Sequence, residues 1–186
     1  MWTAPSSEQE SSIGTTKRQA SSSAFCSESA RKHLTEWRKA DTILDSGLPI
    51  SLKEQIDIEG IEMSLGYVGR VGQVSKRNAL LADILLEAGA VPFVRTNIPQ
   101  GLVFAESMNN LFGKTLNPHN RALTSGGSSG GETALLAMKG SICGVGSDLG
   151  GSIRSPASFN GLYGLRPSSG RVPCTFNCPF HVWRGN

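Results

Sequence analysis

Residues 76–94 read KRNALLADILLEAGAVPFV, and this stretch decides the fold. From Leu80 to Ala88 its apolar residues recur at three- and four-residue spacing, which predicts an amphipathic helix over residues 76–88. Gly89 is expected to end this helix, because glycine readily adopts the left-handed conformation that commonly follows a helix.

Two β-rich runs flank the helix. One covers residues 50–56 and carries Lys53 at its far side, and the other covers residues 91–94. A strand, a long crossover helix and a second strand are typical of a parallel α/β sheet. The second half repeats this order, with a helix predicted over residues 132–139 and a buried strand over residues 142–145. Parallel sheets bind ligands in the loops beyond the carboxyl ends of their strands, so the glycine-rich loops of this half are expected to form a site.

The composition limits the classes of protein to which the chain can belong. Its 186 residues suggest roughly one domain, and its 18 basic and 15 acidic residues leave a formal net charge of +3. This charge is too small to indicate binding to nucleic acid or to an acidic membrane surface. No run of about 18 apolar residues occurs, and we therefore expect no transmembrane helix. The 22 glycines are nearly twice the usual share of about 7%, and they cluster in the loops.

The ends of the chain and the cysteines carry weaker signals. Residues 1–24 are expected to form a disordered Ser-rich tail, followed by a short helix over residues 27–39. The four cysteines show no disulfide framework, which indicates a reducing compartment such as the cytoplasm. Two cysteines and a histidine near the end match no standard zinc spacing and lack a fourth ligand. We therefore expect no metal site at Cys174, Cys178 and His181.

Residues 125–132 read SGGSSGGE and lie directly ahead of a predicted helix. Gly-Ser runs are usually linkers, but here no spacer separates the run from the helix. Glycines let backbone N–H groups approach a ligand, and the start of a helix adds positive potential. The spacing from Gly126 to Gly131 is that of a phosphate loop, but Glu132 stands where that motif requires a lysine and would repel phosphates. A phosphate-binding module therefore remains as a weak alternative.

A second loop, residues 144–154, has the composition that acyl transfer needs. Two glycines before a serine allow successive N–H groups to point into one concavity, with the Ser152 hydroxyl group at its rim. A serine is a poor nucleophile unless a base takes its proton, and the three histidines show no evident Ser-His-Asp arrangement. A lysine can act as this base when burial lowers its pKa enough to leave it neutral. Lys53 follows an apolar run and suits this role.

Several separate segments of the sequence resemble the amidase signature family. Three of them lie in the second half of the chain: GGSSGGE at residues 126–132, GSDLGGSIRSPA at 146–157 and GLYGLRP at 161–167. LPISLK at residues 48–53 looks like the strand that bears the essential lysine of the family. NNLFGKTLNP at residues 109–118 is similar to the acetamidase-type branch typical of fungi. The segments occur in the order of the family, and the resemblance covers residues 25–173.

This resemblance implies an α/β fold of the amidase-signature type, with a mixed, largely parallel sheet flanked by helices. It also implies hydrolysis of a carboxylic amide to a carboxylate and ammonia or an amine through an acyl-enzyme, without a cofactor. Ser152 would be the nucleophile, Ser128 would be held by a cis peptide bond and relay the proton, and Lys53 would be the final base. Backbone N–H groups from Leu149 to Ser152, those of Gly150 and Gly151 included, would form the oxyanion hole, and Ser129 would add to the binding of the substrate. Hydrogen bonds would hold these loops through Ser129, Asp148 and Arg154.

The sequence departs from the family pattern in three places. Ser46-Gly47 stands where the family usually carries His-Gly, and Glu54 stands where Asp commonly follows the lysine. Family domains run to several hundred residues, whereas this chain leaves the pattern after Pro173. We therefore expect residues 25–173 to be the N-terminal portion of an amidase domain, followed by a non-family tail over residues 174–186.

A partial domain would leave an unpaired sheet edge and exposed apolar surface, which favours homo-oligomers or aggregation. Two interpretations of function stay open: an active amidase, and a truncated, catalytically inactive fragment. For an active enzyme, the acetamidase-like segment predicts simple aliphatic amides as substrates, with fatty-acid amides and transamidation as alternatives.

Overall fold

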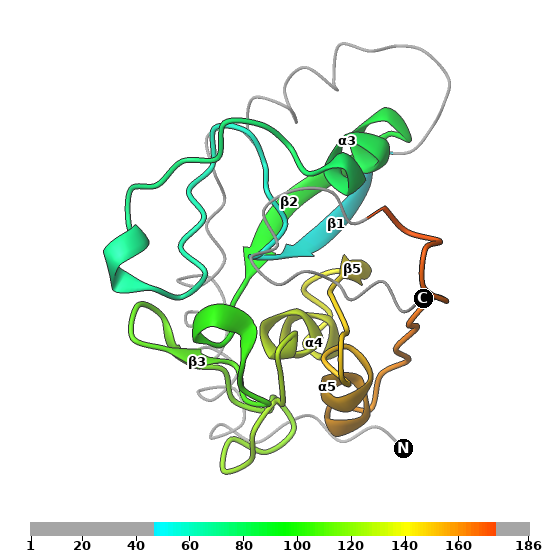
Figure 1. Ribbon diagram of the computed structural model, residues 1–186. Coiled ribbons are helices and arrows are strands. Elements are labelled where there is room, and N and C mark those ends of the chain that lie inside the picture. The colour runs from blue at the N-terminus through cyan, green and yellow to red at the C-terminus, as the bar shows by residue number, and fades with distance from the viewer. Residues whose placement is uncertain (1–46, 174–186) are drawn as a thin grey trace.

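The computed structural model describes residues 47–173 (Figure 1). Its elements are, in chain order, β1 (Leu48–Lys53), η1 (Val68–Arg70), α3 (Leu80–Glu87), β2 (Ala90–Thr96), η2 (Gln100–Leu102), β3 (Met108–Asn109), β4 (Gly113–Lys114), α4 (Gly130–Ala137), β5 (Cys143–Val145) and α5 (Arg154–Phe159). Within this part of the chain, no helix has the length and apolar character needed to cross a bilayer. The tails predicted at residues 1–24 and 174–186 and the helix predicted at residues 27–39 lie outside the described residues.

Three strands form a parallel sheet in the order β2-β1-β5, which confirms the predicted α/β architecture. The last residues of β1 and β2, Lys53 and Thr96, are paired across the sheet. A separate antiparallel pair, β3 and β4, makes the strand directions mixed. In Figure 1, α3 lies beside β1 and β2, whereas α4 and α5 lie together near β5.

The two faces of β1 differ in chemical character because side chains alternate along a strand. Ile50 and Leu52 lie on one face and form the buried core with Ala82 of α3. Ser51 and Lys53 lie on the opposite face, and both are fully buried. This second face meets α4 and the loop that precedes it.

Helix α3 is shorter than the sequence predicts, because it begins only at Leu80. Before it, Asn78 accepts a hydrogen bond from the Glu59 N–H at 2.7 Å and donates one to Asp83 Oδ1 at 2.8 Å. These contacts hold the residues before α3 in a loop instead of a helical turn. The predicted end is confirmed, because Gly89 comes directly after the helix with a φ of 86°.

Other elements also differ from their predicted limits. β1 ends at Lys53, because the Ile56 N–H donates to the Lys53 carbonyl oxygen at 2.9 Å and closes a turn. β2 extends beyond the predicted run at both ends, and α4 begins at Gly130 rather than at residue 132.

The prediction that residues 142–145 form a buried strand is wrong in one respect. β5 is present, but Ile142 is 76% exposed and Cys143 is exposed as well. In the described part of the chain β5 pairs with β1 alone. Whether a partial domain leaves an unpaired sheet edge stays a prediction.

Candidate active site

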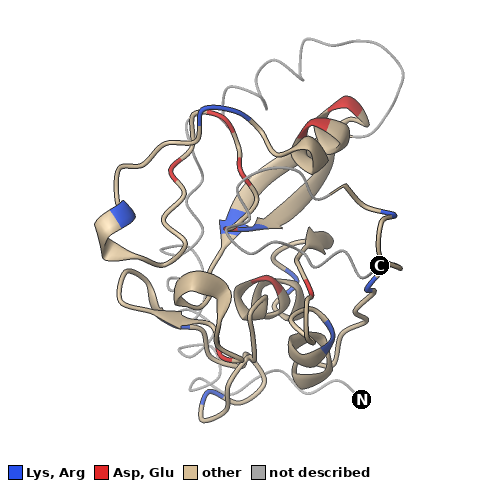
Figure 2. Ribbon diagram, viewed as in Figure 1, with Lys and Arg blue, Asp and Glu red and all other residues tan. Residues whose placement is uncertain are grey.

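Lys53 lies at the centre of the candidate site. It ends β1 at the carboxyl edge of the parallel sheet, and its side chain is 0% exposed. Its Nζ donates hydrogen bonds to Ser128 Oγ at 2.6 Å and to Ser147 Oγ at 2.8 Å. Figure 2 shows basic residues at the adjacent ends of β1 and β2 and an acidic residue in α4. The fold thus brings the predicted lysine into contact with both glycine-rich loops.

The loop before α4 places Ser128 by close packing of its backbone. The peptide bond between Gly127 and Ser128 is cis. A Cβ atom on Gly127 would lie 2.9 Å from the backbone of Ala105, and one on Gly131 would lie 2.4 Å from the backbone of Asn97. Side chains do not fit at these positions, which explains why glycines stand on both sides of the paired serines.

This loop is neither a linker nor a phosphate loop. Residues 125–132 are all buried, which a flexible linker would not be. Three of the N–H groups that a phosphate would need already have acceptors at 2.9–3.2 Å: those of Ser129, Gly130 and Gly131 donate to Ser152 O, Ser107 Oγ and Asn97 O, respectively. The structure therefore contradicts both alternatives.

Ser152 lies beside this loop, because its carbonyl oxygen accepts the hydrogen bond from the Ser129 N–H at 3.1 Å. The residue is half-buried. Among residues 47–173, no group forms a hydrogen bond with Ser152 Oγ. The fold thus brings the backbone of Ser152 next to Ser128 and leaves the Ser152 hydroxyl group unengaged.

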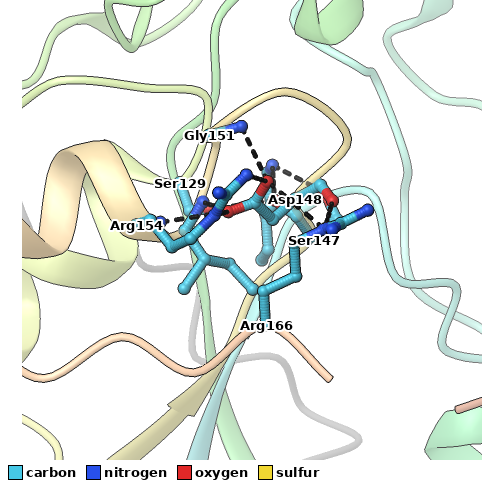
Figure 3. A network of polar contacts seen from close by, with 8 residues as sticks. Ser129, Ser147, Asp148, Gly151, Arg154 and Arg166 are labelled. Atoms are coloured by element: carbon cyan, nitrogen blue, oxygen red, sulfur yellow. Dashed lines mark hydrogen bonds and ion pairs between the residues drawn. The ribbon is translucent and has the colours of Figure 1, made fainter. Parts of the chain in front are cut away.

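Asp148 organises the loop that leads to Ser152 (Figure 3). Its carboxylate accepts hydrogen bonds from the Gly151 N–H at 2.7 Å and from the Arg154 side chain at 2.9 and 3.0 Å. The N–H groups of Ile153 and Arg154 also donate to it. The Arg154 side chain, more than the other donors, holds the pKa of Asp148 well below its usual range, although burial acts in the opposite direction. An ionised Asp148 therefore fixes this loop from inside.

The predicted oxyanion donors share one loop but differ in their engagement. The Gly151 N–H is turned toward Asp148. By contrast, the N–H groups of Leu149, Gly150 and Ser152 donate no hydrogen bond to any described residue. Leu149 is also 69% exposed, so this part of the loop is open to an incoming ligand.

Two residues of the site were missed by the sequence reasoning. Ser147, whose hydroxyl group is bound to Lys53 Nζ, also donates to Gln55 Oε1 at 2.5 Å. Arg166 donates from Nε to the Asp148 carbonyl oxygen at 3.0 Å and forms an ion pair with its carboxylate at 3.8 Å (Figure 3). Their place within the motifs GSDLGGSIRSPA and GLYGLRP is the signal that could have found them.

Glu132 contributes a second buried ionisable group next to the site. Its carboxyl group is 3% exposed and accepts hydrogen bonds from Ser51 Oγ and, at 2.5 Å, from Thr96 Oγ1. Burial raises the pKa of Glu132 to about 7, although these hydrogen bonds and the charge of Lys53 act in the opposite direction. The sequence indicates only that Glu132 would repel phosphates, and it does not predict these contacts.

The described residues offer neither a histidine nor a metal cluster in place of Lys53. His119 Nε2 lies 3.1 Å from the Asn160 carbonyl oxygen. Between Gly47 and Pro173, no group of histidine, cysteine and acidic side chains is arranged to hold a metal ion. The set excluded on its spacing, Cys174, Cys178 and His181, lies outside that part of the chain.

Comparison with known proteins agrees with the motifs. The profile of the family Amidase matches residues 11–182. The acetamidase of Emericella nidulans is 50% identical over 127 residues, which are 68% of this chain and 23% of that protein. The putative amidase kk1C of Curvularia clavata is 52% identical over 126 residues, again 68% of this chain and 23% of that protein.

Solved structures give the same result. A fatty acid amide hydrolase superposes with a TM-score of 0.61 and 42% identity, covering 66% of this chain and 22% of the other. A crystal structure of an amidase gives a TM-score of 0.65 and 27% identity, covering 82% of this chain and 38% of the other. The chain spans about a quarter of the length of the curated relatives it matches. Since the family profile covers most of the sequence and the motif residues gather around one buried lysine, the chain belongs to the amidase family.

Proposed function

We propose that this chain supplies the catalytic groups of an amide hydrolase that works through a serine acyl-enzyme. The observation that carries the proposal is the 2.6 Å hydrogen bond between the fully buried Lys53 Nζ and Ser128 Oγ. A lysine with a hydroxyl partner and no exposure to water is the kind of base that a serine nucleophile needs when no histidine is at hand.

In the proposed acylation step, Ser152 Oγ attacks the carbonyl carbon of the amide. Its proton passes to Ser128 Oγ, whose own proton passes to Lys53 Nζ. This relay needs a neutral amine, and burial favours the neutral form of a lysine. It also needs Ser152 Oγ to turn toward Ser128 Oγ when the substrate binds, and such contacts commonly tighten only in the complex.

The tetrahedral intermediate then collapses. The carbon–nitrogen bond breaks, and the leaving nitrogen takes a proton from Lys53 by way of Ser128, which releases ammonia or an amine. Water attacks the acyl-enzyme by the same relay, frees the carboxylate and restores the Ser152 hydroxyl group.

The negative charge that develops on the carbonyl oxygen needs hydrogen-bond donors. We assign this role to the N–H groups of Leu149, Gly150 and Ser152, because the Gly151 N–H is engaged with Asp148. Ionised Asp148 keeps the loop in shape before the substrate arrives, and preorganised donors of this kind stabilise a transition state strongly.

The proposed substrate class is a carboxylic amide with a short aliphatic acyl group. This choice rests on the 50% identity to a protein named acetamidase. A fatty acid amide is the second candidate, because a structure of that hydrolase superposes at 42% identity.

A fluorophosphonate probe tests the proposal, since it reacts with a serine only when the serine is activated. Ser152 Oγ would attack phosphorus and expel fluoride, and the adduct would be located by peptide mass spectrometry. We expect labelling at Ser152 that falls strongly in Ser128→Ala and is lost in Ser152→Ala, with Ser169→Ala as a matched control on an exposed serine. Labelling that survives unchanged in Ser128→Ala would contradict the relay.

One observation favours the second interpretation, a catalytically inactive fragment. Leu149, in the loop that leads to Ser152, and Leu165, the neighbour of Arg166, are largely exposed, whereas acyl pockets are apolar enclosures. A folded chain that shows no labelling at Ser152 would establish this interpretation and overturn the first.

A further inference from the structure

Glu132 is the one ionisable residue of α4, and the proposed mechanism does not use it. It lies in the first turn of the helix that begins directly after Ser128 and Ser129, and it is 3% exposed. Buried carboxyl groups are unfavourable unless a specific set of partners holds them. The partners of Glu132 therefore indicate what it does.

Those partners belong to β1, which carries Lys53, and to β2, which is paired with it. Ser51, which donates to one carboxyl oxygen, stands two residues before Lys53 on the same face of β1. Thr96, which donates to the other oxygen at 2.5 Å, is the residue of β2 that is paired with Lys53. The carboxyl group thus ties β1 and β2 to α4 at the level of Lys53.

The third strand leaves room for this group. A Cβ atom on Gly144 of β5 would lie 1.9 Å from Glu132 Oε1 and 2.8 Å from Ser51 Oγ. The glycine is therefore required by the carboxyl group and its hydroxyl donor. Each of the three strands of the parallel sheet therefore has a residue suited to Glu132: β1 and β2 each supply a hydroxyl donor, and β5 supplies a glycine.

Glu132 also acts on the Lys53 amine through its charge, in addition to the hydrogen bonds that it accepts from β1 and β2. β1, β2, β5 and α5 pack against α4. From β1, Lys53 is the charged group whose field acts on Glu132. β2 presents the hydroxyl of Thr96, the thiol of Cys143 on β5 is exposed, and Arg154 of α5 is bound to Asp148. Because such coupling is reciprocal, a negative Glu132 favours the protonated form of Lys53.

Building on the proposed function, we infer that Glu132 is the positioning residue of the catalytic amine. Its carboxyl group fixes Lys53 opposite Ser128 by bridging β1 and β2, and its charge sets the pH at which Lys53 becomes able to accept the proton.

Glu132→Gln tests both parts, because it keeps the size of the side chain and removes its charge. The rate constant for fluorophosphonate labelling of Ser152 is measured against pH, together with the titration of Lys53 by NMR of a ¹³Cε-labelled lysine. We expect the maximal rate to fall by on the order of tenfold to a hundredfold, because the amine is less well placed. We expect the midpoint of the pH profile of the labelling rate and the midpoint of the Lys53 titration both to move to lower pH by about one unit. The reason is that an opposite charge near Lys53 has been removed.

Glu132→Asp separates position from charge. It keeps the charge but not the reach, so the midpoints should return toward the native values while the rate stays low. Thr96→Val serves if Glu132→Gln does not fold, because it removes one donor to the carboxylate and should move both midpoints in the same direction. Glu59→Gln, at an exposed carboxylate, is the matched control and should change neither quantity.

The outcomes distinguish this inference from the proposed function. A Glu132→Gln protein with native rate and native midpoints overturns the inference, and so does a lower rate without any shift, which would show a merely structural role. Labelling that is unchanged in Lys53→Met overturns the proposed function. If labelling is absent even in the native chain, the shift in the Lys53 titration still decides whether Glu132 acts on the amine.

Discussion

The two faces of β1, a strand of six residues, differ in chemical character, because one is apolar and the other is polar. On the face toward α3, Ile50 and Leu52 pack against apolar side chains and add stability, roughly 1.5–3 kcal/mol for each fully buried side chain. On the face toward α4, Ser51 and Lys53 are equally buried but polar, and their burial is tolerable only because partners satisfy them. One face therefore stabilises the strand, and the other uses that stability to hold a lysine away from water.

The sharpest way to test this division is Lys53→Met, which should abolish function without weakening the fold. Removing a general base lowers rates by about 10²–10⁴-fold, so labelling of Ser152 should be lost. The free energy of unfolding should change by less than about 1.5 kcal/mol at acidic pH, where Glu132 is protonated and needs no cation. Probe labelling and urea denaturation measure the two quantities. A protein that loses labelling because it no longer folds would contradict the separation of the faces.

The converse test is Leu52→Ala on the apolar face. Leu52 is 0% exposed, and truncating such a side chain lowers the free energy of unfolding by about 2–5 kcal/mol. The labelling rate of the molecules that remain folded should fall far less than in Lys53→Met. Leu80→Ala, at a side chain that is 43% exposed, is the matched control and should destabilise the protein much less. Equal destabilisation by the two variants would show that the core does not lie on this face.

A smaller effect is expected at the loop that leads to Ser152. Asp148→Asn weakens the hydrogen bonds that shape this loop and should lower the labelling rate on the order of tenfold. The Arg154 side chain is 52% exposed, so the ion pair itself adds little to stability.

The pH dependence of stability distinguishes the contribution of the negative charge of Asp148 from that of the size and shape of its side chain. The pKa of Asp148 is lowered in the folded protein, so its stabilising contribution is complete above its unfolded value of about 3.9 and is lost as the pH falls toward the lowered value. Lowering the pH should therefore reduce the free energy of unfolding more in the native protein than in the Asp148→Asn protein. Denaturation at neutral and at acidic pH measures this difference. Identical acid sensitivity would show that Asp148 is not held in its ionised form.

The order of the elements could be predicted from the sequence because it depends on local periodicity. The apolar spacing of α3 and the β-rich runs on both sides of it are properties of neighbouring residues. The limits of these elements were less predictable, since the start of α3 depends on contacts of Asn78 with residues on both sides of it. The exposure of β5 could not be predicted, because it depends on which segments pair with β5 in the folded protein and not on its own residues.

The site shows the same division between local and distant causes. Lys53 and the paired serines stood out because their residue types suit the chemistry and their motifs resemble a family. Ser147 and Arg166 also lie within such motifs, but their residue types do not indicate a role, which arises only when folding brings them onto Lys53 and Asp148. The charge of Glu132 is evident from the sequence, whereas its contacts with Ser51 and Thr96 come from the pairing of strands.

The packing of Gly127 and Gly131 has a consequence for how such a protein can diversify. No side chain fits between these glycines and the main chain of Ala105 and Asn97, so backbone packed against backbone fixes the loop that carries Ser128. Replacing side chains elsewhere leaves this contact between the backbone segments unchanged. The sequence around it can therefore vary while Ser128 keeps its place.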